Sequence, residues 1–121
     1  MKCKKFILKL LFLAIFVSGL MISCNEPEPQ KLIVFFSHTG NAKFVTEHIQ
    51  SLTGADVFEL VPIEPYTEEN VFALSAQQRE DGVLPALVGK IENFDDYDII
   101  FLGSPNWFGT LSLPVLSFGH L

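Results

Sequence analysis

The sequence VFFSHTGNAKF, residues 34–44, passes from an apolar run through small polar residues into a helical pattern. The whole apolar run, Leu32–Phe36, predicts a strand that is buried on both faces, as in a parallel sheet. Ala42–Thr53 follows with the spacing of an amphipathic helix. The polar cluster Ser37–Asn41 therefore joins the carboxyl end of a buried strand to the amino end of a helix.

Strand and helix patterns continue to alternate along the rest of the chain. The residues expected on the buried side of the first helix are Val45, Ile49 and Leu52. The further expected elements, in chain order, are a strand at Asp56–Val61, helices at about 69–78 and 84–93, a doubly buried strand at Asp98–Leu102 and the start of a helix at Leu113–Phe118. This alternation predicts right-handed crossovers and a doubly wound parallel sheet, an α/β fold.

Two loops of this predicted fold lie where ligands bind. In doubly wound sheets the ligand site is beyond the carboxyl ends of the strands, where the strand order reverses. The polar cluster Ser37–Asn41 and the loop Gly103–Gly109 both follow a buried strand. If these strands are neighbours, the two loops frame one site.

The polar cluster has two interpretations. In the first it binds phosphate, through the hydroxyls of Ser37 and Thr39 and the backbone N–H groups of Gly40, Asn41 and Ala42 at the positive end of the helix dipole. Glycine there lets the backbone approach closely and adopt unusual dihedral angles. In the second, a side chain of the cluster merely caps the helix.

Two motifs resemble flavodoxins, which bind flavin mononucleotide (FMN). SHTGN, residues 37–41, resembles the phosphate loop of that family. DIIFLGSPNWFGT, residues 98–110, resembles its third strand and first flavin-ring loop. The resemblance extends from Lys31 to about Phe118. It implies a flavodoxin-like fold, FMN as the cofactor, and a role as an electron-transfer protein or oxidoreductase.

The resemblance also implies which residues bind the cofactor. The residues expected to hold the phosphate are Ser37, Thr39, Gly40, Asn41 and Ala42. The residues expected to border the flavin ring are Pro105, Asn106, Trp107, Phe108 and Gly109, with Trp107 or Phe108 offering an aromatic face. Ala42 replaces a hydroxyl residue common in the family, which removes one hydrogen bond worth about 1 kcal/mol. His38, at a variable position in a solvent-facing loop, is expected to be incidental, and no catalytic residue or metal ligand is predicted.

The number of strands departs from the family. Flavodoxins have five strands in the order 2-1-3-4-5, and this chain has counterparts of three. The resemblance therefore implies an incomplete sheet in the order 2-1-3, without strands 4 and 5, as in a truncated or frameshifted chain. Its third strand would be an apolar edge that invites pairing with another chain, including a second copy of this one. The alternative function is a tethered interaction module without cofactor or activity.

The first residues have the layout of a bacterial lipoprotein. Residues 1–23 combine a basic start with a short apolar run, which predicts a signal peptide. Met21-Ile22-Ser23-Cys24 resembles the lipobox, in which the cysteine becomes the lipidated amino terminus. Residues 24–30 would then be the lipidated cysteine and a linker, and 31–121 the flavodoxin-like domain. This predicts an exported protein of the bacterial cell envelope, anchored to a membrane by lipid.

Charge and residue usage exclude several other classes. Residues 1–23 hold four of the eight basic side chains and none of the 14 acidic ones, so residues 24–121 carry four against 14, a formal net charge of −10. This charge disfavours nucleic acid as a partner. The resemblance to flavodoxins implies a redox protein as the partner, and the sequence does not identify it. The two cysteines are Cys3, in the signal peptide, and Cys24, so the domain has no cysteine for a disulfide, a cysteine-ligated metal site or a thiol nucleophile. It also lacks the glycine-rich motifs of P-loop and dinucleotide-binding proteins. The loop 37–41 has neither the cysteine nor the arginine of a tyrosine phosphatase, and Gly103 stands where a receiver domain would have an aspartate.

Overall fold

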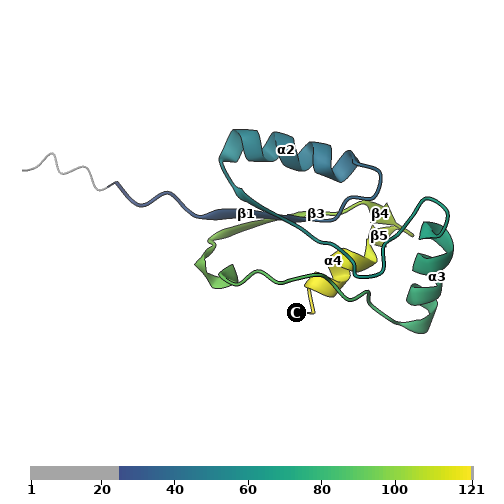
Figure 1. Cartoon of the computed structure of the whole chain (residues 1–121). Coiled ribbons are helices and arrows are strands. Elements are labelled where there is room, and N and C mark those ends of the chain that lie inside the picture. Colours follow the sequence, from purple (N-terminus) through teal and green to yellow (C-terminus); the bar gives the residue numbers. More distant parts are fainter. Residues whose placement is uncertain (1–24, 121) are drawn as a thin grey trace, which may run out of the picture.

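The computed structural model of the chain describes residues 25–120, so the predicted signal peptide and Cys24 lie outside the described residues. The elements are β1 (Lys31–Phe35), α2 (Asn41–Thr53), β2 (Asp56–Glu59), α3 (Val71–Asp81), the 3-10 turn η1 (Phe94–Asp96), β3 (Ile99–Gly103), β4 (Asn106–Trp107), β5 (Thr110–Leu111) and α4 (Leu113–Phe118) (Figure 1). Within the described residues, no helix is long and apolar enough to cross a membrane.

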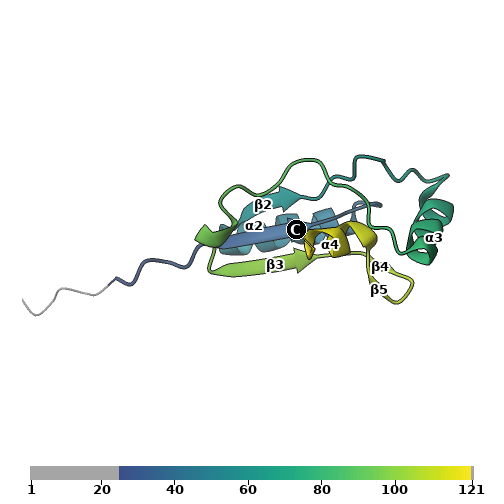
Figure 2. The same ribbon diagram turned by 90° about the horizontal axis from the view of Figure 1, so that it is seen from below.

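β1 is the central strand of the main sheet. It pairs in parallel with β2 on one side and β3 on the other, which gives the order β2-β1-β3 (Figure 2). Its residues 32–35 are at most 2% exposed, because strands flank both edges and other elements cover both faces. The predicted parallel α/β sheet in the order 2-1-3 is confirmed.

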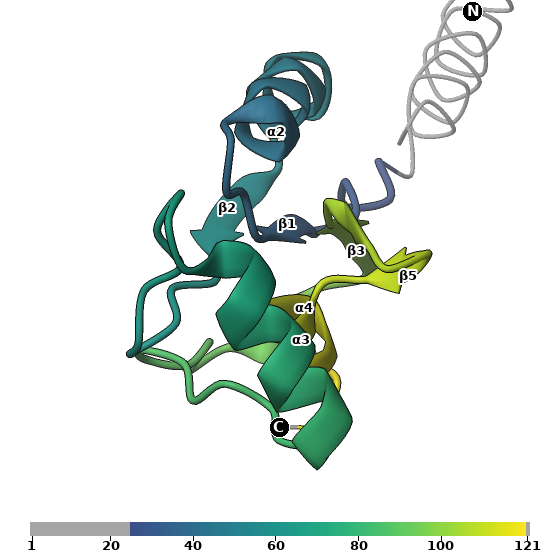
Figure 3. The same ribbon diagram turned by 90° about the vertical axis from the view of Figure 1, so that its right-hand side faces the viewer.

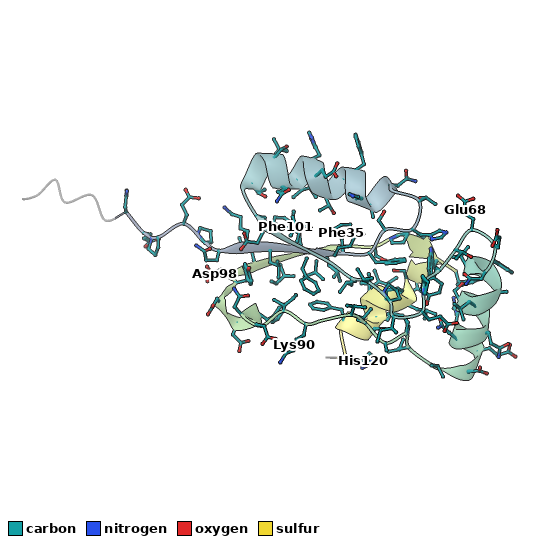
Figure 4. All side chains as sticks on the ribbon, viewed as in Figure 1. Phe35, Glu68, Lys90, Asp98, Phe101 and His120 are labelled. Atoms are coloured by element: carbon teal, nitrogen blue, oxygen red, sulfur yellow. The ribbon has the colours of Figure 1, made fainter. Side chains whose placement is uncertain are left out.

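The two faces of the sheet are covered differently. α2 lies over one face, and α4 lies under the other (Figure 3). The main core is on the α4 side, where Leu32 and Val34 of β1 form a buried cluster with Phe36, Leu60 and Val115. Side chains alternate along a strand, so the α2 side receives Ile33 and Phe35 instead. Figure 4 shows Phe35 and Phe101 between the sheet and α2.

The buried side of α2 differs from the prediction. Thr46 is 3% exposed, whereas Val45 and Leu52 are 54% and 73% exposed. Ile49 is partly buried, as expected. The residues nearest the sheet are thus centred on Thr46 and Ile49, and Val45 lies at the border of the contact. Hydrophobic spacing missed this because a threonine occupies the most buried position.

The helix predicted at 84–93 is wrong. The segment is extended and runs antiparallel to residues 61–63, with Ile63 N–H donating to Ala86 O and Val88 N–H donating to Val61 O, both at 2.8 Å. Ser117 of α4 adds a hydrogen bond from its hydroxyl to Pro85 O, also at 2.8 Å. These tertiary hydrogen bonds satisfy the backbone that a helix would otherwise pair internally.

β3 is an edge strand in the described part of the chain. Its outer side has no strand partner there, and Ile99, Ile100 and Leu102 are 39%, 37% and 49% exposed. The prediction that this run is buried on both faces is therefore wrong, while the prediction that it forms an apolar edge is confirmed. A continuous apolar run predicts a buried strand, and its sequence alone does not indicate whether a neighbouring strand pairs with its outer edge.

Candidate functional site

The loops after β1 and β3 lie side by side at the carboxyl ends of these strands. Phe36 N–H donates to Gly103 O at 3.0 Å, which fixes the start of one loop against the start of the other. Between them is a cavity of about 640 Å³. The predicted site residues that line it are Ser37, Thr39, Asn41, Ala42, Pro105 and Asn106. The two loops are neighbours, as expected, and residues of both line this cavity; its role as a ligand site stays a prediction.

The first loop both caps α2 and keeps free hydrogen-bond donors. Ser37 Oγ accepts the backbone N–H of Lys43 at 3.2 Å, so the capping interpretation holds for Ser37. Gly40 adopts a left-handed conformation with φ 93°, which favours glycine. Among the described residues, the backbone N–H groups of residues 38–42 have no hydrogen-bond acceptor. These donors lie at the amino end of a 13-residue helix, where an anion is stabilised.

The second loop is closed by a pair of serines. Ser104 Oγ accepts the backbone N–H of Ser112 at 2.9 Å and lies 3.1 Å from Ser112 Oγ. Between them the chain forms a short antiparallel hairpin, β4 and β5, which the sequence did not predict. Its turn is Phe108–Gly109, with φ 54° and 81°, so Phe108 holds a conformation that is uncommon outside glycine.

The predicted ring-loop residues are divided between two cavities. Asn106 lines the large cavity and also a smaller one of about 260 Å³ between the hairpin and α3. Trp107 and Phe108 line only the smaller one, where Phe108 lies 5.8 Å from Phe72 between ring centroids. The Arg79 guanidinium is 5.3 Å from the centroid of the Phe108 ring. Gly40 and Gly109, the remaining predicted residues, supply turns rather than lining surface.

Trp107 belongs to an aromatic cluster beneath the two loops. Its ring meets those of Phe36, His38 and Tyr66 edge to face, at centroid distances of 5.4, 6.2 and 5.0 Å. Tyr66 O–H donates to Gln78 Oε1 at 2.5 Å. Burial, with a smaller contribution from the nearby Glu64 carboxylate, raises the pKa of Tyr66 to about 12.

This raised pKa predicts a loss of stability at high pH. The folded state favours the neutral phenol, so its contribution is complete below pH 10, the usual pKa, and is lost as pH rises towards 12. The slope cannot exceed about 1.4 kcal/mol per pH unit for one proton. Urea unfolding at pH 9 to 12 should show wild type losing stability relative to Tyr66→Phe over this window. Tyr97→Phe removes the hydroxyl that donates to Asp56 and leaves Tyr66 intact, so this variant should keep the Tyr66-dependent loss. Parallel curves for wild type and Tyr66→Phe would contradict the prediction.

Sequence reasoning missed Thr46 and Ser104 as cavity residues. In the described residues, every fully buried side-chain oxygen or nitrogen has a hydrogen-bond partner. The Thr46 hydroxyl has no partner, so it is not fully buried, and it opens to the cavity that Thr46 lines. Ser104 lines the cavity while it holds the hairpin closed. Thr46 follows Ala42 by one helical turn, so the two residues lie on the same face of α2. This spacing could have predicted that Thr46 lines the cavity together with Ala42. The described residues contain no cluster of histidine, cysteine and acidic side chains that could hold a metal.

Comparison with known proteins identifies the family. Residues 30–117 match the sequence model of the family described as Flavodoxin. The chain belongs to the flavodoxin family. No curated protein matches it in sequence.

Solved structures with the same flavodoxin-like fold come from several bacteria. A candidate flavoprotein from Bacteroides eggerthii DSM 20697 is 28% identical with a TM-score of 0.69, and the match covers 75% of this chain and 61% of that one. A candidate flavoprotein from Bacteroides uniformis ATCC 8492 is 22% identical with a TM-score of 0.67, and the match covers 76% of this chain and 62% of that one. A flavoprotein in complex with FMN from Lactobacillus acidophilus NCFM is 22% identical with a TM-score of 0.65, and the match covers 74% of this chain and 63% of that one. This flavodoxin-family chain thus spans about three-fifths of the length of these neighbours.

Proposed function

We propose that this flavodoxin-family chain binds FMN in the large cavity and serves in electron transfer. The observation that carries the proposal is the cavity itself, because it combines about 640 Å³ of space with the free N–H groups of residues 38–42. Pockets for ligands of cofactor size are usually 300–1,000 Å³. A neighbour of the same fold was crystallised with FMN, which agrees with this choice of ligand.

The residues present suit the parts of FMN. The free N–H groups and the hydroxyl of Thr39 would hold the phosphate, with Ser37 supplying a further hydroxyl while it caps the helix. Pro105 and Asn106 would border the flavin, and Thr46 and Ser104 offer hydroxyls to the remainder of the ligand. Bound FMN would supply the electron chemistry, while the protein supplies binding and electrostatics.

A single substitution tests the phosphate site. Thr39→Ala should weaken FMN binding by about fivefold, because a neutral hydrogen bond is worth about 1 kcal/mol, and should leave riboflavin binding unchanged. Fluorescence titration of both flavins measures this, and Thr53→Ala at the other end of α2 is the matched control. Equal weakening for both flavins would contradict the phosphate assignment. A chain that is colourless after incubation with excess FMN and removal of the free flavin would favour the interaction module without cofactor.

We also propose that the chain is exported and anchored by a lipid on Cys24. The support is the sequence of residues 1–24: a basic start, a short apolar run and a cysteine at its end. Labelling cells with a fatty-acid analogue should mark the wild-type chain and Cys3→Ser, since Cys3 lies within the signal peptide. Cys24→Ser should be unmarked, and labelling of that variant would contradict the proposal.

A further inference from the structure

His38 is the ionisable residue of the large cavity. Of the described residues that line this cavity, no other carries a side chain that titrates. His38 lies between Ser37 and Thr39, is partly buried, and meets the indole of Trp107 edge to face. Its sequence position suggested a side chain that projects from a solvent-facing loop. In the structure, the contact with Trp107 holds the imidazole in place instead.

The groups around His38 come from several elements. Glu59 at the end of β2 and the phenol of Tyr66 line, together with His38, a second cavity of about 180 Å³. Lys43 lies in the first turn of α2, next to the loop, and Trp107 of β4 is uncharged. The ion pairs found in residues 25–120 lie elsewhere, so no salt bridge there engages the imidazole.

We propose that His38 is a specificity-determining residue that recognises the doubly charged phosphate monoester of FMN. The inference rests on the proposed FMN binding and names the group that selects this flavin. Backbone N–H groups and hydroxyls would hold a phosphate through neutral hydrogen bonds. A protonated imidazole adds a full positive charge, and hydrogen bonds to charged groups are about twice as strong as neutral ones. Riboflavin has no phosphate, so this contact is lost with it.

The proposal predicts a dependence of affinity on pH. Histidine is the side chain that changes charge near neutrality, and a phosphate monoester keeps most of its second charge above pH 6. FMN should therefore bind more tightly at pH 6.5 than at pH 8.5, by up to about tenfold for a charged hydrogen bond. Riboflavin affinity should not change over this range.

The experiment titrates the full chain in detergent with FMN and with riboflavin at pH 6.5 and 8.5. His38→Gln keeps a neutral donor, so it should lose the gain at pH 6.5 and match wild type at pH 8.5. His38→Lys keeps a fixed charge, so it should bind FMN well at both pH values. His48→Gln, on the exposed surface of α2, is the matched control and should behave as wild type.

The outcomes separate this inference from the proposed function. A wild-type chain that binds no FMN would overturn both. A chain that binds FMN equally at both pH values, or a His38→Gln chain that follows the wild-type pH profile, would overturn the role of His38 and leave FMN binding intact. Equal losses of FMN and riboflavin affinity in His38→Gln would make His38 a structural support for Trp107, which also overturns the inference.

Discussion

Alanine in place of Gly103 is expected to lower the free energy of unfolding by about 2–3 kcal/mol and to weaken FMN binding markedly. A Cβ at this position would lie 2.8 Å from Cβ of Phe35, its partner across β1 and β3. Cβ of Phe35 is fixed to the backbone and cannot turn away, so the end of β3 must move. Ser104–Asn106 follow directly and line the cavity, so the site would move with the strand.

Urea unfolding and FMN titration measure the two effects of Gly103→Ala. Gly119→Ala is the matched control, because Gly119 has an ordinary φ of −68° and an added Cβ would lie 3.5 Å from Leu116 O. That variant should unfold and bind FMN as wild type does. Unchanged stability and affinity in Gly103→Ala would show that the close approach of β1 and β3 is not required.

Self-association through the edge of β3 is the second large effect expected. We propose that the chain pairs with a second copy there, because the strand combines unpaired backbone groups with exposed Ile99, Ile100 and Leu102. The chain from Asn25 onward should then sediment at twice the monomer mass or more. The double variant Ile100→Lys, Leu102→Lys should sediment as a monomer, since a buried pair of lysines at the contact is unfavourable.

The control for this experiment is Leu52→Lys. Leu52 is 73% exposed on α2, away from β3, so the same change there should leave the mass of the assembly unaltered. A wild-type chain that remains a monomer at all concentrations would contradict pairing through β3. An assembly that persists in the double variant would locate the contact elsewhere.

The sequence predicted the elements that local pattern determines. The strand Leu32–Phe36 is observed as Lys31–Phe35, and the helix Leu113–Phe118 has its predicted bounds. The segment 84–93 has similar apolar spacing, but hydrogen bonds to residues 61–63 hold it extended. Such pairing depends on distant residues, so a local pattern cannot reveal it.

The candidate site divides along the same line. The positions of the two loops followed from the topology, since the carboxyl ends of neighbouring parallel strands meet at one edge. The distribution of side chains did not follow, because it depends on how the hairpin packs. Trp107 lies edge to face against Tyr66, a residue far away in sequence, and so it leaves the lining of the large cavity. The cofactor roles of Trp107, Phe108 and Gly109 stay predictions.

The central position of β1 has a consequence for how the chain folds. Leu32 pairs with Asp56, 24 positions later, whereas Lys31 pairs with Ile99, 68 positions later. Closing the longer loop costs about 0.9 kcal/mol more in chain entropy, and contacts distant in sequence form slowly. We therefore expect β1, α2 and β2 to associate first and β3 to dock last. The cavity needs β3, so in a refolding experiment the rise of flavin binding should trail the rise of helical signal.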